Sequence, residues 1–240
     1  MILTQQRPPS VVSGLFERTR QALPCNCLLC GADSPESLVC PDCCAELPAL
    51  PTPRCPHCSE PTTHGERCGS CLQHEPHFDR TIAPWRYAFP IDRLIHGMKY
   101  GHQLAITEWC GDQIAERIID MRFDHIIPMP LHPSRLAERG FNQSAEIART
   151  IGRRINCPVD YSGLFRNKAT PAQAELPLKA RRSNVRGAFE SKRDFSGQRI
   201  LLVDDVMTSG ATVDECARVL RLHGAIDITV AVVARALKHA

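Results

Sequence analysis

Apolar residues follow two different patterns along positions 77–240. Short continuous apolar runs are typical of strands buried on both faces, whereas longer segments with an apolar residue every three or four positions are typical of helices with one buried side. The two patterns alternate, which predicts an α/β fold with a parallel sheet covered by helices on both faces. The expected strands are 81–87, 125–128, 159–161, 200–203 and 228–234, and the expected helices are 91–98, 104–121, 141–155 and 213–223.

Residues 200–213, ILLVDDVMTSGATV, are the most informative stretch. Its apolar start predicts a buried strand, so Asp204 and Asp205 are expected where that strand ends, at the sheet edge where α/β folds bind ligands. The residues that follow are small or carry hydroxyls and open a helix, whose first N–H groups bind phosphate well. This order predicts a ribose-phosphate site, the alternative being an acidic surface turn before an ordinary helix. The expected donors are Thr208, Ser209, Gly210, Ala211 and Thr212.

The segment Pro128–Gln143, PMPLHPSRLAERGFNQ, is expected to be a proline-stiffened basic loop between a strand and a helix. The planar guanidinium groups of Arg135 and Arg139 suit the oxygens of a diphosphate, and Gly140 lets the backbone approach an anion closely. The alternative is a basic surface loop, which explains Arg135 but not the whole cluster. Asn142 is expected to cap the next helix.

A second basic segment, Arg166–Phe189, has little apolar periodicity and is long for a loop. One interpretation is a mobile loop that folds over a bound pyrophosphate and excludes water. The other is a solvated, flexible run of charge, and the residues favour neither. The cations that would act in such a loop are Lys179, Arg181 and Arg182.

Ten of the 13 cysteines lie between positions 25 and 71, and eight of them form a repeat. Each copy reads Cys-x2-Cys, nine residues, Cys-x2-Cys, and the second copy follows 28 positions after the first. Two Cys-x2-Cys turns complete a tetrahedral site, so each copy is expected to hold one structural zinc ion; iron–sulfur ligation is a weaker alternative. Cys25 and Cys44 have no counterpart and are interpreted as spare thiols. The ligands are Cys27, Cys30, Cys40, Cys43, Cys55, Cys58, Cys68 and Cys71.

Composition limits the remaining classes. The net charge of +3 and the pI near 8.3 are only mildly basic and do not by themselves indicate nucleic-acid binding. We expect no membrane span and no signal peptide, because apolar runs of the required length are lacking. So many thiols outside a disulfide framework predict a reducing compartment, the cytoplasm. The expected organisation is an N-terminal segment over 1–22, a double zinc ribbon over 23–76 and the α/β domain over 77–240.

Residues 200–213 resemble the phosphoribosyl pyrophosphate (PRPP) motif of type I phosphoribosyltransferases, in which an apolar strand, two acidic residues and a Thr-Ser/Thr-Gly-x-Thr loop follow one another. The resemblance implies that Asp204 and Asp205 bind the ribose hydroxyls and that the loop from Met207 to Thr212 binds the 5-phosphate. Carboxylates suit hydroxyls and N–H donors suit an anion, so the chemistry agrees. It also implies that Mg²⁺ enters with PRPP, held mainly by the ligand's own oxygens.

The whole chain resembles the ComF family, through the cysteine ribbon, Lys99-Tyr100, Arg139-Gly140-Phe141-Asn142-Gln143 and the acidic pair. That resemblance implies a role in taking up or using external DNA, with single-stranded DNA and DNA-uptake proteins as candidate partners. The zinc ribbon occupies the region where a phosphoribosyltransferase has its base-binding hood. The sequence therefore leaves the acceptor and the oligomeric state open.

Two classes of function remain. The first is a phosphoribosyltransferase, a glycosyltransferase in which Arg139 and Lys99 stabilise the departing diphosphate while Asp204 and Asp205 hold the ribose. The second is a non-catalytic adaptor for single-stranded DNA or protein, in which the PRPP site is regulatory or vestigial.

Overall fold

The computed structural model describes residues 26–100, 103–168 and 183–237. The chain divides into two compact units, with the division after Glu46. The described part of the first unit holds the first cysteine repeat and the short helix α2 (Pro41–Ala45), which begins at the ligand pair Cys40 and Cys43. The second cysteine repeat and its helix α3 (Gly69–Gln73) belong to the same unit as the sheet.

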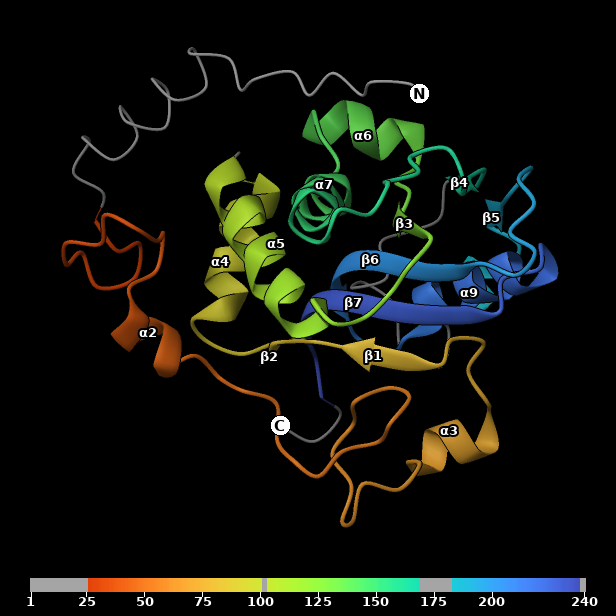
Figure 1. Ribbon diagram of the computed structural model, residues 1–240, viewed down its shortest axis with the longest axis horizontal. Helices are drawn as coiled ribbons and strands as arrows, with labels where there is room; N and C mark the ends of the chain where they lie inside the picture. Colours follow the sequence, from red (N-terminus) through yellow and green to blue (C-terminus); the bar gives the residue numbers. More distant parts are fainter. Residues whose placement is uncertain (1–25, 101–102, 169–182, 238–240) are drawn as a thin grey trace, which may run out of the picture. The chain divides into compact units, whose positions relative to one another are not determined.

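Five strands of the second unit form one parallel sheet in the order β1–β7–β6–β3, with β2 also paired to β7 (Figure 1). A separate two-stranded antiparallel ribbon joins β4 to β5. The strands are β1 (Arg80–Ile82), β2 (Trp85–Arg86), β3 (His125–Pro128), β4 (Phe165–Arg166), β5 (Phe189–Glu190), β6 (Arg199–Met207) and β7 (Asp227–Arg235). The helices of this part are α4 (Ile91–Tyr100), α5 (Leu104–Ile118), α6 (Pro133–Arg139), α7 (Gln143–Ile155) and α9 (Ala211–Leu222).

Helices cover both faces of the sheet, as predicted (Figure 1). Ile200 and Leu202 on β6 belong to one apolar cluster with Cys216 and Leu220 of α9. Successive strand residues point to opposite faces, so Leu201 packs on the other side. There α7 packs against β3 and β6, and α5 packs against β7 and α7. The sheet is therefore buried on both faces, which is why its strands read as continuous apolar runs.

The structure differs from the expected elements in several places. The strand expected over 81–87 is interrupted between Ile82 and Trp85, where Pro84 supplies no backbone N–H. Val159 forms only an isolated bridge with Ile126. The segment after β3, predicted as a loop, contains α6. The basic segment 166–189 begins at the last residue of β4 and ends at the first residue of β5, and these two strands pair with each other.

Within the described ranges, no helix is both long enough and apolar enough to cross a membrane.

Candidate functional site

The acidic pair lies within β6 and not at its end, which corrects the sequence prediction. Pairing with β3 stops at Val203, opposite Pro128, whereas pairing with β7 continues to Met207. Asp204 and Asp205 therefore lie beyond the end of one neighbouring strand while the other still supports them. On the β3 side, β6 has no pairing partner beyond Val203, so on that side the two residues do lie at an edge of the sheet.

Asp204 is held by hydrogen bonds from two donors. The hydroxyl of Ser144, in the first turn of α7, donates to its Oδ1 at 3.1 Å, and the backbone N–H of Asp205 donates to the same oxygen at 2.9 Å. Burial and the negative charge of Asp205 together raise the pKa of Asp204 to about 7. Near neutral pH this carboxyl can therefore exchange a proton, and it is mostly neutral below pH 7 and mostly charged above it.

Asp205 pairs with Lys99, which lies in the last turn of α4. Their Oδ2 and Nζ atoms are 2.9 Å apart, and the side chains are 13% and 23% exposed. Burial alone would lower the pKa of Lys99, but the charge of Asp205 outweighs it and the pKa is raised. The ammonium therefore stays charged at the site.

Each carboxylate also interacts with charged or titratable groups outside the pair. Asp204 acts electrostatically on Cys216 of α9 and on Arg166 of β4. Asp205 acts instead on Cys110 of α5, whose pKa is raised by burial and then by this charge. The two carboxylates therefore have different ionisable neighbours, although Ser144 of α7 and Lys99 of α4 both act on Asp204 as well.

The predicted diphosphate-binding arginines lie on helix α6 and not on a loop. Pro133 takes the first helical position, where its missing N–H costs nothing, and the ring of His132 accepts from the N–H of Ser134 at 3.3 Å. The helix ends at Gly140, whose φ of 77° is left-handed and suits glycine. Gly140 therefore ends the helix here.

Arg139, at the last position of α6, lies close to the acidic site. It donates to Gln143 Oε1 at 3.4 Å, and its positive charge acts to lower the pKa of Lys99. Arg135 acts similarly on Arg166, whose pKa is lowered mainly by burial. Asn142 caps α7 as predicted, accepting from the N–H of Ser144 at 3.0 Å. This cap fixes the serine that holds Asp204.

The predicted phosphate loop joins β6 to α9. The Met207 side chain is buried, so this residue can offer only its backbone to a ligand. Thr208, Ser209 and Gly210 form the turn, and Gly210 is the N-cap of α9 with a left-handed φ of 79°. Ala211 and Thr212 begin the helix, where N–H groups lack intrahelical acceptors. The geometry is that of an anion-binding helix start.

Replacing Gly210 with Ala is expected to destabilise the protein by about 1–3 kcal/mol. The left-handed φ is unfavourable for alanine, and the new Cβ would lie 2.7 Å from Met207 Cε. Gly197→Ala is the matched control, because Gly197 has a similar φ of 75° but open space around its missing Cβ. The midpoint temperature of thermal unfolding should be lower for Gly210→Ala than for Gly197→Ala. Equal midpoints would contradict the predicted clash.

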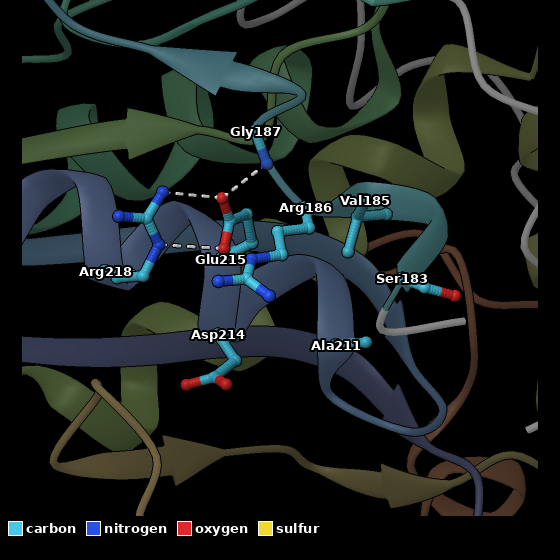
Figure 2. Close-up of a pocket in the computed structure, with 8 residues that line it drawn as sticks. All are labelled: Ser183, Val185, Arg186, Gly187, Ala211, Asp214, Glu215 and Arg218. Carbon is cyan, nitrogen blue, oxygen red and sulfur yellow. Dashed lines mark hydrogen bonds and ion pairs between the residues drawn. The ribbon is translucent and has the colours of Figure 1, made fainter. Parts of the chain in front are cut away.

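A cavity of about 700 Å³ adjoins the phosphate loop along α9 (Figure 2). Its walls come from the segment before β5 and from the first two turns of α9, whose Glu215 accepts from Gly187 N–H at 2.8 Å and from Arg218 Nη2 at 2.7 Å. Asp204 and Asp205 do not line it, so it adjoins the phosphate loop and not the acidic pair. The lining residues are Ser183, Val185, Arg186, Gly187, Ala211, Asp214, Glu215 and Arg218.

Each cysteine repeat gathers its four sulfur atoms, as predicted. Within each group all four Sγ atoms lie within 4.8 Å of one another. The Sγ separations are 3.8 Å between Cys30 and Cys40 and 3.5 Å between Cys58 and Cys68. Tetrahedral zinc with Zn–S bonds of about 2.3 Å requires sulfurs roughly 3.8 Å apart, so both groups fit structural Zn²⁺. Cys44 belongs to neither group, and Cys25 lies outside the described residues.

Sequence reasoning missed three residues of this region. Ser144 donates a hydrogen bond to Asp204, and the charge of Asp204 acts on Arg166. Arg235 donates hydrogen bonds to the phosphate loop from inside the protein. Ser144 lies two residues after the predicted cap Asn142, so its position could have indicated a role. The two arginines belong to no recognisable sequence motif. The proposed loop cations Lys179, Arg181 and Arg182 lie outside the described residues.

Parts of the chain match known protein families, and most of it aligns with curated relatives. Residues 137–240 match the phosphoribosyl transferase domain family, and residues 19–72 match the double zinc ribbon domain family. The chain is 34% identical to the DNA utilization protein YhgH of Escherichia coli O157:H7, over 76% of this chain and 84% of that protein. It is also 34% identical to Competence protein F of Haemophilus influenzae, over 77% and 85%. Among solved structures, a purine phosphoribosyltransferase from Pyrococcus horikoshii Ot3 aligns with 65% of this chain and 78% of its own, at 16% identity and a TM-score of 0.34.

Proposed function

Because the chain belongs to the ComF family of competence and DNA-utilisation proteins, we propose that it binds PRPP or a related phosphorylated sugar. The observation that carries this proposal is the continuity of β6, the loop 207–212 and α9. Acceptors for hydroxyl groups and donors for an anion follow one another along a few residues of backbone. Asp204 and Asp205 would bind the ribose hydroxyls, and the loop would bind the 5-phosphate.

The diphosphate end of the ligand would lie against Lys99 and Arg139. These two cations are close enough for one to influence the pKa of the other, and they come from the ends of α4 and α6. A divalent cation such as Mg²⁺ would enter with the diphosphate, with Asp204 and Asp205 as the nearest protein carboxylates, and would neutralise charge on the leaving group. Arg135 would extend the basic surface on the same helix.

Transfer of the ribosyl phosphate to an acceptor is the reaction that this arrangement supports. Carbon 1 gains positive character as diphosphate leaves, so the neighbouring carboxylates and the cations on the leaving group both favour the transition state. The partial burial of Asp205 and Lys99 strengthens their interaction relative to bulk water. The described residues do not identify the acceptor.

A second candidate function is that of an adaptor for single-stranded DNA in the uptake or use of external DNA. It is favoured by the names of the two relatives, DNA utilization protein and Competence protein F. The cations around the site, Arg135, Arg139 and Arg166, would then contact backbone phosphates. In this case the sugar-phosphate site would regulate the adaptor or be vestigial.

We place either function in the cytoplasm. The cysteines of the described ranges form no disulfide with one another, and eight of these cysteines are gathered in the two four-cysteine groups. Thiolate ligands need a reducing compartment to remain available for a metal. This location is supported by the thiol chemistry and is part of the proposal.

The test is a calorimetric titration of the full chain with PRPP and Mg²⁺, repeated in the presence of a short single-stranded oligonucleotide, with diphosphate release followed in parallel. PRPP binding with a micromolar to millimolar Kd is expected, in the range typical of metabolic substrates. Mutual exclusion would mean that both ligands use one surface.

The outcomes separate the two candidates. Diphosphate release in the presence of an acceptor supports the transferase. Salt-sensitive DNA binding without turnover across a broad range of acceptors supports the adaptor. A wild-type protein that binds neither PRPP nor ribose 5-phosphate at millimolar concentration would contradict the proposed ligand.

A further inference from the structure

We propose that Arg235 is a positioning residue that makes the geometry of the phosphate loop depend on the second four-cysteine site. The inference rests on the proposed function in that it takes the loop 207–212 as the site of the sugar phosphate. It concerns residues that contact no ligand themselves. The observation behind it is a buried arginine whose hydrogen bonds reach both the cysteine repeat and the loop.

Arg235 is the last residue of β7 and is 1% exposed. Toward the cysteine repeat, its Nε donates to the carbonyl of Cys58 at 2.9 Å and its Nη2 lies 3.0 Å from Glu60 Oε2. Toward the loop, its Nη1 donates to the carbonyls of Met207 at 3.1 Å and Thr208 at 2.5 Å, and to that of Ala236. A planar, five-donor group suits such a junction, whereas lysine offers a single point charge.

The bonds to the loop orient its backbone. In a trans peptide the C=O of one residue and the N–H of the next point in opposite directions. The carbonyls of Met207 and Thr208 point toward Arg235, so the N–H groups of Thr208 and Ser209 point away from it. In the proposed site, that is the side on which the anion would be received. Arg235 thereby holds two anion donors in their binding orientation.

The bonds to the cysteine repeat make that orientation depend on the metal-binding turn. The turn is closed by the N–H of Cys55, which donates to the carbonyl of Glu60 at 2.8 Å, and by the N–H of Ser59, which donates to the carbonyl of Cys55 at 3.0 Å. Cys58 and Cys71 belong to the same apolar cluster as Met207. A cavity of only about 40 Å³, lined by Cys58, Cys71 and Met207 among others, separates the two parts.

A bound metal would fix Cys55 and Cys58 of this turn together with Cys68 and Cys71, and its loss would free the turn that presents the Cys58 carbonyl and the Glu60 carboxylate to Arg235. The buried guanidinium would then lose two of its acceptors and could shift. The Thr208 carbonyl would lose the guanidinium as a donor, whereas the Met207 carbonyl would keep the N–H of Ala236 at 2.9 Å. The first four-cysteine group belongs to the other compact unit and offers a matched control, because its loss leaves every bond of Arg235 intact.

The experiment compares the full-length wild type, Cys55→Ser/Cys58→Ser, Cys27→Ser/Cys30→Ser, Arg235→Lys and Glu60→Gln. Zinc content confirms the loss of one ion in each cysteine variant, and thermal unfolding identifies the variants that remain folded. Hydrogen exchange of the peptide spanning 207–212 reports the loop without any ligand, and calorimetry with PRPP and Mg²⁺ reports its affinity.

Faster exchange in the loop and about tenfold weaker PRPP binding are expected for Cys55→Ser/Cys58→Ser, Arg235→Lys and Glu60→Gln. Cys27→Ser/Cys30→Ser should match the wild type in both. Unchanged loop exchange in the second-site variants would overturn the inference, as would equal effects of the two cysteine pairs. If Arg235→Lys unfolds, Glu60→Gln decides, since it keeps the arginine. A wild type that binds no PRPP refutes the proposed function, and hydrogen exchange then decides the inference alone.

Discussion

Replacing Asp204 and Asp205 together with Asn is expected to lower the affinity for PRPP at least about 100-fold, because each lost charge-assisted hydrogen bond is worth about 1.5–3 kcal/mol. Each carboxylate can accept from a ribose hydroxyl through either oxygen, whereas an amide offers one acceptor and places a donor in the other position. Calorimetric titration with PRPP and Mg²⁺ measures the loss. Binding of the double variant within about threefold of the wild type would refute the assigned role of the pair.

The same pair makes a prediction about stability that separates lost binding from lost folding. Burial and the charge of Asp205 raise the pKa of Asp204 in the folded protein to about 7, above its unfolded value near 4. This group therefore stabilises the fold fully below pH 4, and its contribution is lost as pH rises through 7.

At pH 8 the Asp204→Asn variant should then be as stable as the wild type or more so, by on the order of 1 kcal/mol. The asparagine oxygen can still accept from Ser144, so that contact is retained. Thermal unfolding at pH 5 and pH 8 measures the effect, and the advantage of the variant should be larger at pH 8. A variant that is less stable at pH 8 than at pH 5, relative to the wild type, would contradict the assigned pKa. Site residues that cost stability are expected where function requires buried charge.

Local sequence patterns predicted much of this fold, because the buried positions of a strand or helix recur at a regular spacing and are occupied by apolar residues. The strands of the sheet lie between two layers of helices, so β3 and β7 appear in the sequence as apolar runs, and the predicted limits of both are correct to within one residue. Cysteine spacing was equally direct, since a Cys-x2-Cys turn has few ways to close on a metal. Asn142 was predicted as a cap from its side-chain chemistry, and it caps α7.

Features that depend on distant contacts were missed. Helix α6 has no buried residue, so no apolar period marks it, and only Pro133 and Gly140 signal its ends. The end of β6 was placed too early because two acidic residues look like a strand terminus, whereas pairing with β7 carries the strand to Met207. Arg235 lies 175 positions from Glu60, and nothing local indicates that the two meet. Long-range polar contacts of this kind leave no period in a sequence.

Replacing Lys99 with Met is expected to weaken PRPP binding by about 10- to 100-fold and to change its dependence on pH. Methionine keeps the length and the apolar stem of the side chain, so packing at the end of α4 is largely retained. The change removes the ammonium 2.9 Å from Asp205 and, with it, a charge that acts to lower the pKa of Asp204. Asp204 should then be protonated to a higher pH than in the wild type.

The measurement is PRPP affinity across pH 6 to 9 for the wild type, Lys99→Met and Lys99→Arg. Wild-type affinity should fall as pH drops below about 7, where Asp204 gains a proton and loses an acceptor. In Lys99→Met the fall should begin at higher pH, whereas Lys99→Arg keeps the charge and should follow the wild type. Because the phosphates of PRPP also titrate in this range, Asp204→Asn supplies the baseline, and the shift is read as the difference from it. Identical pH profiles for the Met and Arg variants would mean that Lys99 acts on the diphosphate alone and has no part in keeping Asp204 charged.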